Sequence, residues 1–205
     1  MGVVVFPICL SLAMPVLIYN LVLEKEIKLL ENMKINGLNI RTYWKVTGVY
    51  NLVLYWATCA GFWFCGRYIF DISLFQDTHV MMFVEILALW GLCQVALAFF
   101  FSSFMSNSQT GAMTGYGIAI WTVCIGANLT QSVYALPRRM PGKLMFYPTF
   151  PFVRAFYLLI DPCTWDTCHG EYHLMPSEFR EMEGYLFLNF VVYMVLAAYL
   201  QQVVP

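Results

Sequence analysis

The residues with the clearest chemical potential are two cysteines and two histidines that lie close together in a polar segment. They read Cys163-x4-Cys168-His169-x3-His173. Thiolate and imidazole groups are the ligands that structural zinc prefers, but this spacing does not match a common zinc finger. We expect the segment to face an oxidising compartment, where thiols form disulfides. The sequence therefore favours a local disulfide between Cys163 and Cys168 over a metal site.

Three charged residues, Arg67, Glu85 and Arg154, stand within or beside apolar runs. A charge in hydrocarbon is costly, and intramembrane charges are commonly functional. Glu85 is then a functional group that pairs with Arg67 or meets a lipid headgroup. Alternatively, it is a snorkelling or protonated acid near a membrane surface. The same two interpretations apply to Arg154.

No group of residues predicts catalysis. An intramembrane enzyme needs a nucleophile with its base, or a metal site. The sequence contains no H-E-x-x-H, no G-x-S-x-G and no paired aspartates within an apolar run. It also lacks the G-x-x-x-x-G-K-[ST] phosphate loop of ATPases. We therefore expect no enzyme activity, and no cofactor or metal bound by the chain itself.

The composition predicts an integral membrane protein. Of the 205 residues, 60% are hydrophobic and 11% are charged, and the mean hydropathy is +0.67. Ordinary globular domains carry about 25% charged residues, so a soluble domain of this composition would have too little polar surface to cover itself. The formal net charge of −1 and the lack of a basic run give no sign of nucleic-acid binding. Composition does not distinguish a plasma membrane from an internal one.

Apolar runs long enough to cross a bilayer recur along the chain. The predicted fold class is all-α, with about five transmembrane helices, a re-entrant or exofacial helical hairpin and one amphipathic interfacial helix. The whole chain, 1–205, would form one transmembrane domain. We expect spans at about 2–23, 46–66, 80–101, 111–136 and 184–204, the hairpin at 144–160 and a polar loop at 161–183.

The first run begins without the basic region and cleavage site of a signal peptide. We take this to indicate a fragment, or a chain that has lost what normally precedes the run.

Small and polar residues within the spans predict contacts between helices. Gly111, Gly115 and Gly117 permit close packing, more simply within one bundle than between two copies. A few polar residues stand among large aromatics, where they would suit a lipid path or ordinary helix packing: Asn51, Thr58, Thr114 and Thr122.

The segment Leu23–Lys45 is a polar island between the first two spans. Acids at its start and Lys34 near its end suit the dipole of a helix over 24–36, and Gly37 stands where a C-cap glycine is expected. A narrow apolar stripe makes this helix amphipathic, so it should lie at one membrane face. Five Lys and Arg residues fall within 21 positions, which favours the cytosolic face. A helix that only connects two spans would show the same features.

Several segments, in the same order along the chain, resemble the transmembrane domain of subfamily-A ABC transporters, which are lipid exporters. The segment Phe101–Met105, followed by Gly111–Gly115, resembles the loop between the fourth and fifth spans of that family. PTFPFVRAF, residues 148–156, resembles its paired exofacial helices, and Tyr199–Pro205 resembles the end of its sixth span. The charged segment resembles the stretch after its second span: Glu24-Lys-Glu26, Lys28, Met33, Gly37-Leu38 and Tyr43-Trp44.

The resemblance implies the transmembrane part of an ATP-driven transporter of lipid or another hydrophobic substrate. The first span, ectodomain and nucleotide-binding domain of the family are absent from this sequence. Its partners would be a nucleotide-binding domain that holds ATP and Mg, a second transmembrane half, and membrane lipid. Helix 24–36 would be the coupling helix that faces the ATPase through Glu24, Lys25, Glu26, Lys28, Glu31 and Lys34. The alternative is a non-transporting scaffold or assembly subunit that keeps the transporter-like fold.

Overall fold

The computed structural model describes residues 2–37, 39–135, 138–163 and 177–203. The described residues form helices and no strand, which confirms the predicted all-α membrane fold. Short π-helical turns lie at Cys65–Ile69 and Leu129–Val133, and a 3-10 turn lies at Leu144–Phe146. The α-helices are α1 (Gly2–Ser11), α2 (Ala13–Glu26), α3 (Leu29–Ile35), α4 (Ile40–Phe64), α5 (Ser73–Asp77), α6 (Val80–Ser102), α7 (Ser108–Asn128), α8 (Thr149–Cys163) and α9 (Ser177–Val203).

Four helical segments in the described part of the chain are long and apolar enough to cross a membrane. They are Gly2–Glu26, Val80–Ser102, Ser108–Val133 and Ser177–Gln201. The fifth predicted span, 46–66, falls on α4, which has 25 residues but does not reach the same hydropathy. Its polar and amphipathic residues, Asn51 among them, lower its mean hydropathy. The last span begins at Ser177, seven positions before the predicted start at 184.

The first membrane-spanning segment is interrupted at Leu12, where α1 ends and α2 begins. Pro15 has no N–H to donate to the carbonyl four residues earlier, so a regular helix is not maintained there. Just before the interruption, the Ser11 hydroxyl donates to the Pro7 carbonyl at 2.6 Å, within α1. The interruption leaves the Leu10 carbonyl available to another helix.

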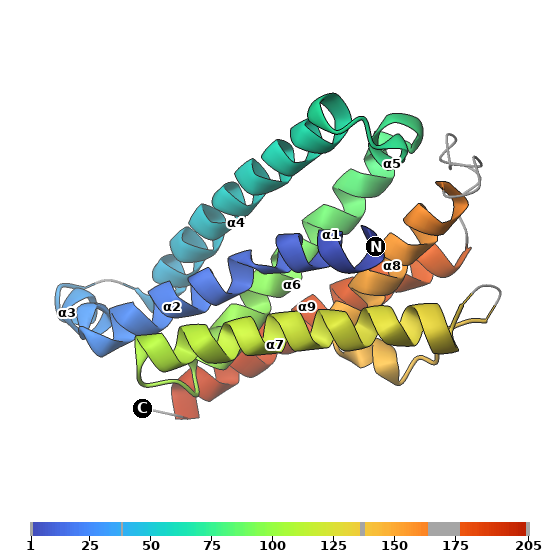
Figure 1. Ribbon diagram of the computed structural model, residues 1–205. Helices are drawn as coiled ribbons and strands as arrows, with labels where there is room; N and C mark the ends of the chain where they lie inside the picture. Colours follow the sequence, from blue (N-terminus) through green and yellow to red (C-terminus); the bar gives the residue numbers. More distant parts are fainter. Residues whose placement is uncertain (1, 38, 136–137, 164–176, 204–205) are drawn as a thin grey trace.

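Helix α6 lies at the centre of the bundle and contacts α2, α4, α8 and α9 (Figure 1). Two stacked aromatic pairs fix its position. Trp90 of α6 stacks on Phe152 of α8 with ring centroids 4.2 Å apart, and Phe99 stacks on Trp44 of α4 at 4.8 Å. Farther along α4, the buried Tyr55 also lies against Gly91 of α6, whereas several large apolar side chains on the other side of α4 are exposed.

The predicted hairpin at 144–160 is a 3-10 turn followed by the single helix α8. Residues 151–159 of α8 are all buried, among α1, α7 and α9. This helix is therefore part of the packed core.

The bundle has two ends, which we name by their residues (Figure 1). The insert end holds the end of α2, α3, the start of α4 and the turn between α6 and α7. The far end holds the end of α4, α5, the start of α6 and the start of α9. The predicted coupling segment thus lies at one end, and residues 177–183, which begin α9, lie at the other.

Candidate functional site

The charged insert is not one continuous helix. The expected helix over 24–36 divides at Lys28, whose φ of 54° lies in the left-handed region. Glu24–Glu26 complete the last turn of α2, and α3 begins at Leu29. Gly37 follows α3 with a φ of 86°, the conformation that glycine supplies at a helix end.

Two carboxylates of the last turn of α2 make contacts within the chain. Glu24 accepts a hydrogen bond from the Tyr43 hydroxyl at the start of α4. Burial and the Glu24 carboxylate raise the pKa of Tyr43 well above its ordinary value, so the phenol remains a neutral donor. Glu26 accepts from the Ser108 backbone N–H at 3.0 Å. These acids therefore connect α2 to α4 and α7, and their contact with a partner stays a prediction.

The other predicted partner-facing residues divide into two groups. Lys25 and Lys28 are exposed at the insert end. The side chains of Glu31 and Lys34 lie outside the described part of the structure.

The N-terminus of α7 is capped from two directions. Asn107 Oδ1 accepts from the backbone N–H of Gln109 at 2.9 Å and of Thr110 at 3.3 Å. The carboxylate of Glu26 completes the cap, where the helix dipole favours a negative charge. The start of α7 is thus held by a side chain from α2.

Two of the three predicted packing glycines lie against α2. A Cβ at Gly111 would lie 3.4 Å from both Ile18 and Val22, and one at Gly115 would lie 3.1 Å from Pro15 Cα. Nothing lies within 4 Å of the corresponding position at Gly117. The close approach is within the bundle, and it joins α2 and α7 along most of α2.

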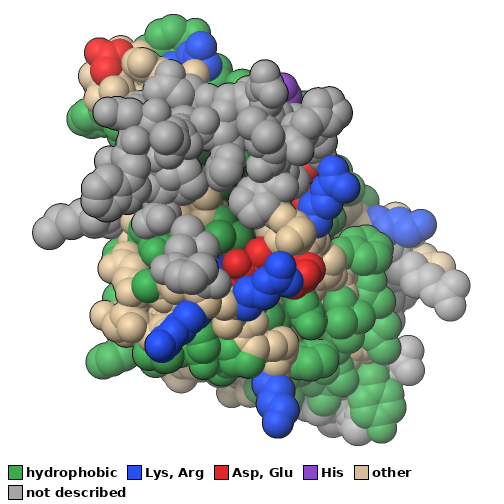
Figure 2. Space-filling view, turned by 90° about the vertical axis from the view of Figure 1, so that its right-hand side faces the viewer, with side chains coloured by type: hydrophobic (Ala, Val, Ile, Leu, Met, Phe, Trp, Pro, Cys, Tyr) green, Lys and Arg blue, Asp and Glu red, His purple; other side chains and the backbone are tan. Residues whose placement is uncertain are grey.

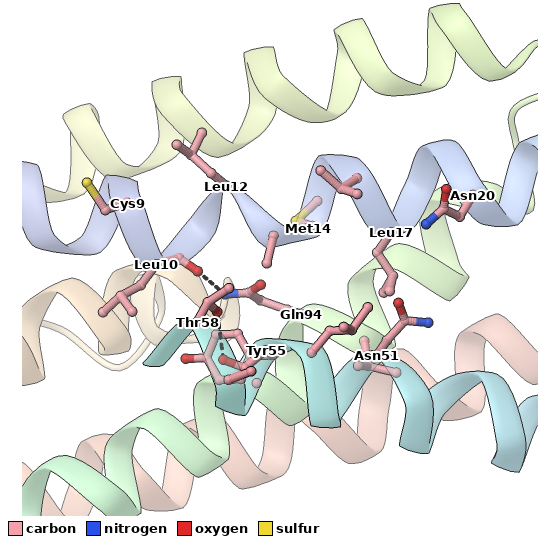
Figure 3. A pocket seen from close by; sticks show the side chains of 16 residues that line it. Cys9, Leu10, Leu12, Met14, Leu17, Asn20, Asn51, Tyr55, Thr58 and Gln94 are labelled. Atoms are coloured by element: carbon pink, nitrogen blue, oxygen red, sulfur yellow. Dashed lines mark hydrogen bonds between the residues drawn. The ribbon is translucent and has the colours of Figure 1, made fainter. Parts of the chain in front are cut away.

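A cavity of about 620 Å³ lies between α1 and α2 on one side and α4 and α6 on the other. This size is typical of small-molecule sites. Its walls are mainly apolar, with five amide or hydroxyl side chains: Asn20, Asn51, Tyr55, Thr58 and Gln94. Figure 3 shows Cys9 at one end of this cavity and Asn20 and Asn51 at the other.

The polar side chains of the cavity are held in place by backbone groups. Gln94 Nε2 donates to the Leu10 carbonyl at 2.7 Å, at the interruption between α1 and α2. Asn51 donates to the Thr47 carbonyl and Thr58 to the Tyr55 carbonyl, both at 2.7 Å. Their remaining hydrogen-bonding capacity is available on the cavity side.

Of the four polar residues predicted in the spans, Asn51 and Thr58 line the cavity. Thr122 instead donates to the Ile118 carbonyl at 2.7 Å and contacts Thr149 of α8. Thr114 does not line the cavity either. The polar residues of α4 therefore face a hollow, and Thr122 of α7 serves helix packing.

Arg154 is fully buried at the far end, and all three of its side-chain nitrogens donate hydrogen bonds. Its Nε donates to Glu178 Oε1 at 2.9 Å and its Nη2 to Glu178 Oε2 at 3.1 Å. Nη2 also donates to the Arg138 carbonyl at 2.8 Å, and Nη1 donates to the Tyr134 carbonyl. Arg154 therefore ties α8 to the start of α9 and to the chain after α7, and is neither a snorkelling side chain nor an open headgroup site.

Glu85 and Arg67 are not placed as a pair. Glu85 of α6 lies near Glu183 of α9. Arg67 lies over the Trp63 ring at 5.2 Å and donates to the Phe75 carbonyl at 3.4 Å. Figure 2 views this far end, where basic and acidic side chains gather around an apolar surface.

The predicted Cys163–Cys168 disulfide lies outside the described residues. Within the described ranges, no group of three or more His, Cys, Asp or Glu side chains is arranged to hold a metal ion.

Known proteins with similar sequences match nearly the whole chain. ABC transporter A family member 9 of Dictyostelium discoideum is 29% identical over 202 residues, which are 98% of this chain and 24% of that protein. Member 7 of the same organism is 28% identical over the same share of this chain. ABC transporter A family member 6 of Arabidopsis thaliana is 24% identical over 210 residues. No family model matches the sequence.

The resemblance to part of a subfamily-A ABC transporter is confirmed. The chain spans about a quarter of the length of the relatives it matches. The segments that carry the resemblance to ABC transporters occupy defined places in the fold. Glu24–Glu26 end α2, residues 101–105 form the end of α6 and its turn, and residues 148–156 open α8.

Two residues that shape the cavity, Gly91 and Gln94, were not predicted from the sequence. Gly91 of α6 lets the Tyr55 ring approach so closely that a Cβ would lie 2.6 Å from it. Gln94 bonds to the interruption between α1 and α2. A glycine and a glutamine within an otherwise apolar run were the available signals, since each is unfavourable there without a specific contact.

Proposed function

We propose that the chain is the transmembrane part of an ATP-driven transporter that moves lipid or another hydrophobic substrate. The observation that carries this proposal is the similarity to ABC transporter A family members over 98% of the chain. The cavity between α2, α4 and α6 supports it, because an apolar hollow with a few hydrogen-bonding groups suits a hydrophobic molecule with a polar part.

In this proposal a nucleotide-binding domain exerts mechanical force on the insert end of the bundle. A nucleotide-binding domain with ATP and Mg would press on α3 and on exposed Lys25 and Lys28. The Glu24–Tyr43 bond would pass the movement to α4, and the Glu26–Ser108 bond would pass it to α7. This chain would bind no nucleotide and hydrolyse none, since its sequence lacks the phosphate loop.

The consequence for the cavity follows from unequal packing. Glycines join α2 and α7 closely, so these two helices would move as one body. Helix α4 packs on α6 and has few contacts with α2, so it would move relative to α2. Movement at the insert would then open or narrow the cavity that lies between them.

The test is ATP-dependent transport in proteoliposomes. The full protein that contains this chain, with its nucleotide-binding domain and second transmembrane half, should move a fluorescent lipid between leaflets when ATP and Mg are supplied. A variant without the phosphate-loop lysine of the partner domain is the control. Assembled particles with no nucleotide-binding domain and no ATP-stimulated transport would reject the proposal and favour a scaffold role.

A further inference from the structure

A second hollow extends the cavity toward the insert end. It has a volume of about 270 Å³ and lies between α2 and the start of α4. Asn20 and Asn51 line both hollows, so the two form one groove along α2 and α4. We call this the α2–α4 groove, and Figure 3 shows Asn20 and Asn51 where the two parts meet.

The groove changes in polarity along its length. At the insert end it is lined by Glu24, Thr47 and Tyr50, and Glu24 is the one charged residue among those that line either hollow. Beyond Asn20 and Asn51 the lining is mainly aliphatic as far as Leu10 and Cys9. A carboxylate at one end and apolar walls along the rest match an amphiphile.

The length of the groove matches one leaflet of a bilayer. Glu24 and Cys9 are fifteen positions apart in the sequence, about 22 Å of helix. Half of a bilayer, headgroup region included, is also about 20–22 Å. An amphiphile with its headgroup at Glu24 would therefore have its chain end near Cys9, in the middle of the membrane.

The chemistry at Glu24 selects the charge of the headgroup. Its carboxylate takes one hydrogen bond, from Tyr43, and two carboxylate oxygens can accept more. Neither ion pair between the described side chains involves Glu24. The Tyr50 ring lines the same hollow, and an aromatic face beside a carboxylate attracts an ammonium group. A phosphate or sulfate would be repelled there.

We propose that the α2–α4 groove binds an amphiphile whose headgroup carries an ammonium group, with the cation at Glu24 and one apolar chain along α2 toward Cys9. The proposal deepens the proposed function, on which it rests for the groove as a substrate path, by naming the headgroup class.

The test uses two probes with the same chain and opposite headgroup charge. They are hexadecyltrimethylammonium and hexadecyl sulfate, each with a photoactivatable diazirine in the chain, added to the full-length protein in lipid nanodiscs without ATP. Mass spectrometry of the labelled peptides should place the ammonium probe on α2 and α4 of the groove. We expect the ammonium probe to label these helices about fivefold more than the sulfate probe does. This is the difference in affinity that one partly exposed ion pair provides.

Two variants separate charge from structure. Glu24→Gln should remove the preference for ammonium, whereas Tyr43→Phe, which breaks the same hydrogen bond but keeps the carboxylate, should retain it. Equal labelling of the wild type by the two probes would overturn the proposal, and so would an unchanged preference in Glu24→Gln. If Glu24→Gln does not fold, the wild-type comparison alone decides.

The outcome is independent of the proposed transport. ATP-driven lipid transport with no ammonium preference in the groove would reject this inference and leave the proposed function standing. Ammonium-selective labelling without ATP-driven transport would support this inference and reject the proposed function.

Discussion

The buried ion pair of Arg154 shows how this apolar chain accommodates a charge. Both nitrogen edges of the guanidinium face acceptors, two of them on Glu178 and two on backbone carbonyls. Such a pair gives little net stability compared with apolar residues of the same volume, but removal of one partner leaves an uncompensated buried charge. The arrangement therefore makes the far end sensitive to a single substitution.

We predict that Glu178→Gln destabilises the protein by about 3–5 kcal/mol, because Arg154 would remain buried without its counter-charge. The measurement is the thermal unfolding midpoint in detergent. Glu181→Gln is the matched control, since its partner Arg139 and Glu181 itself are largely exposed and such pairs contribute little. Equal shifts for the two variants would contradict this account.

The backbone at Lys28 provides a second test on the scale of a residue. Its positive φ suits glycine and opposes a β-branched side chain. Lys28→Val should therefore lower stability by about 1–2 kcal/mol, whereas Lys28→Gly should not. If α2 and α3 formed one continuous helix, glycine would be the more harmful of the two substitutions, and thermal unfolding would reverse their order.

On the scale of helices, α2 and α7 behave as one packed unit. Gly115 brings the backbone of α7 against Pro15, and the Glu26 carboxylate closes the end of the pair. Small residues permit this approach because no side chain separates the two backbones.

The packing predicts opposite results for two glycines of the same helix. Gly115→Leu should destabilise the protein by about 1–3 kcal/mol, because the new side chain meets the α2 backbone. Gly117→Leu should be tolerated, since nothing lies within 4 Å of its Cβ position. Unfolding midpoints in detergent distinguish the two, and a destabilised Gly117→Leu would indicate that this face is covered in the assembled protein.

The contrast between expected and observed helices has a physical origin. Long apolar runs predicted α6 and α9 because hydropathy and length are local properties of the sequence. The division at Lys28 was missed because the acids on either side suit a continuous helix. The end of α2 before this division is held by two contacts between residues distant in sequence. Glu24 contacts Tyr43, 19 residues away, and Glu26 contacts Ser108, 82 residues away.

The candidate site was predictable only in part. Asn51 and Thr58 stood out as polar residues among aromatics, and both line the groove. Their opposite wall could not be foreseen, since it depends on how far α4 diverges from α2. Arg154 was recognised as a costly charge, but its partner Glu178 lies beyond the end of α8.

At the scale of the whole molecule, the groove connects the insert, where the nucleotide-binding domain would act, with the proposed substrate path. It opens beside the insert, where force would arrive, and it extends to the middle of the bundle. A substitution that fills it should therefore affect transport without touching the insert.

We predict that Ala57→Trp, which places a large ring in the groove, lowers ATP-driven lipid transport by about tenfold or more. A loss of about 1.4 kcal/mol in the free energy of substrate binding corresponds to a tenfold loss of affinity. Val49→Trp is the control, because Val49 is largely exposed, lines neither hollow and lies on the side of α4 away from Asn51 and Thr58. The assay is the transport measurement in proteoliposomes. Equal effects of both substitutions would indicate a general disturbance of α4.

The ion pair of Arg154 also constrains how the protein is made. Translation delivers α8 before α9, and 24 residues separate Arg154 from Glu178. Until the start of α9 emerges from the ribosome, the guanidinium has no counter-charge, and burying it in hydrocarbon would be costly. We therefore expect α8 to wait at the water interface and to enter the bundle together with α9. Ribosome-stalled chains that end before Glu178 should leave α8 accessible to water-soluble reagents, and chains that end after α9 should protect it.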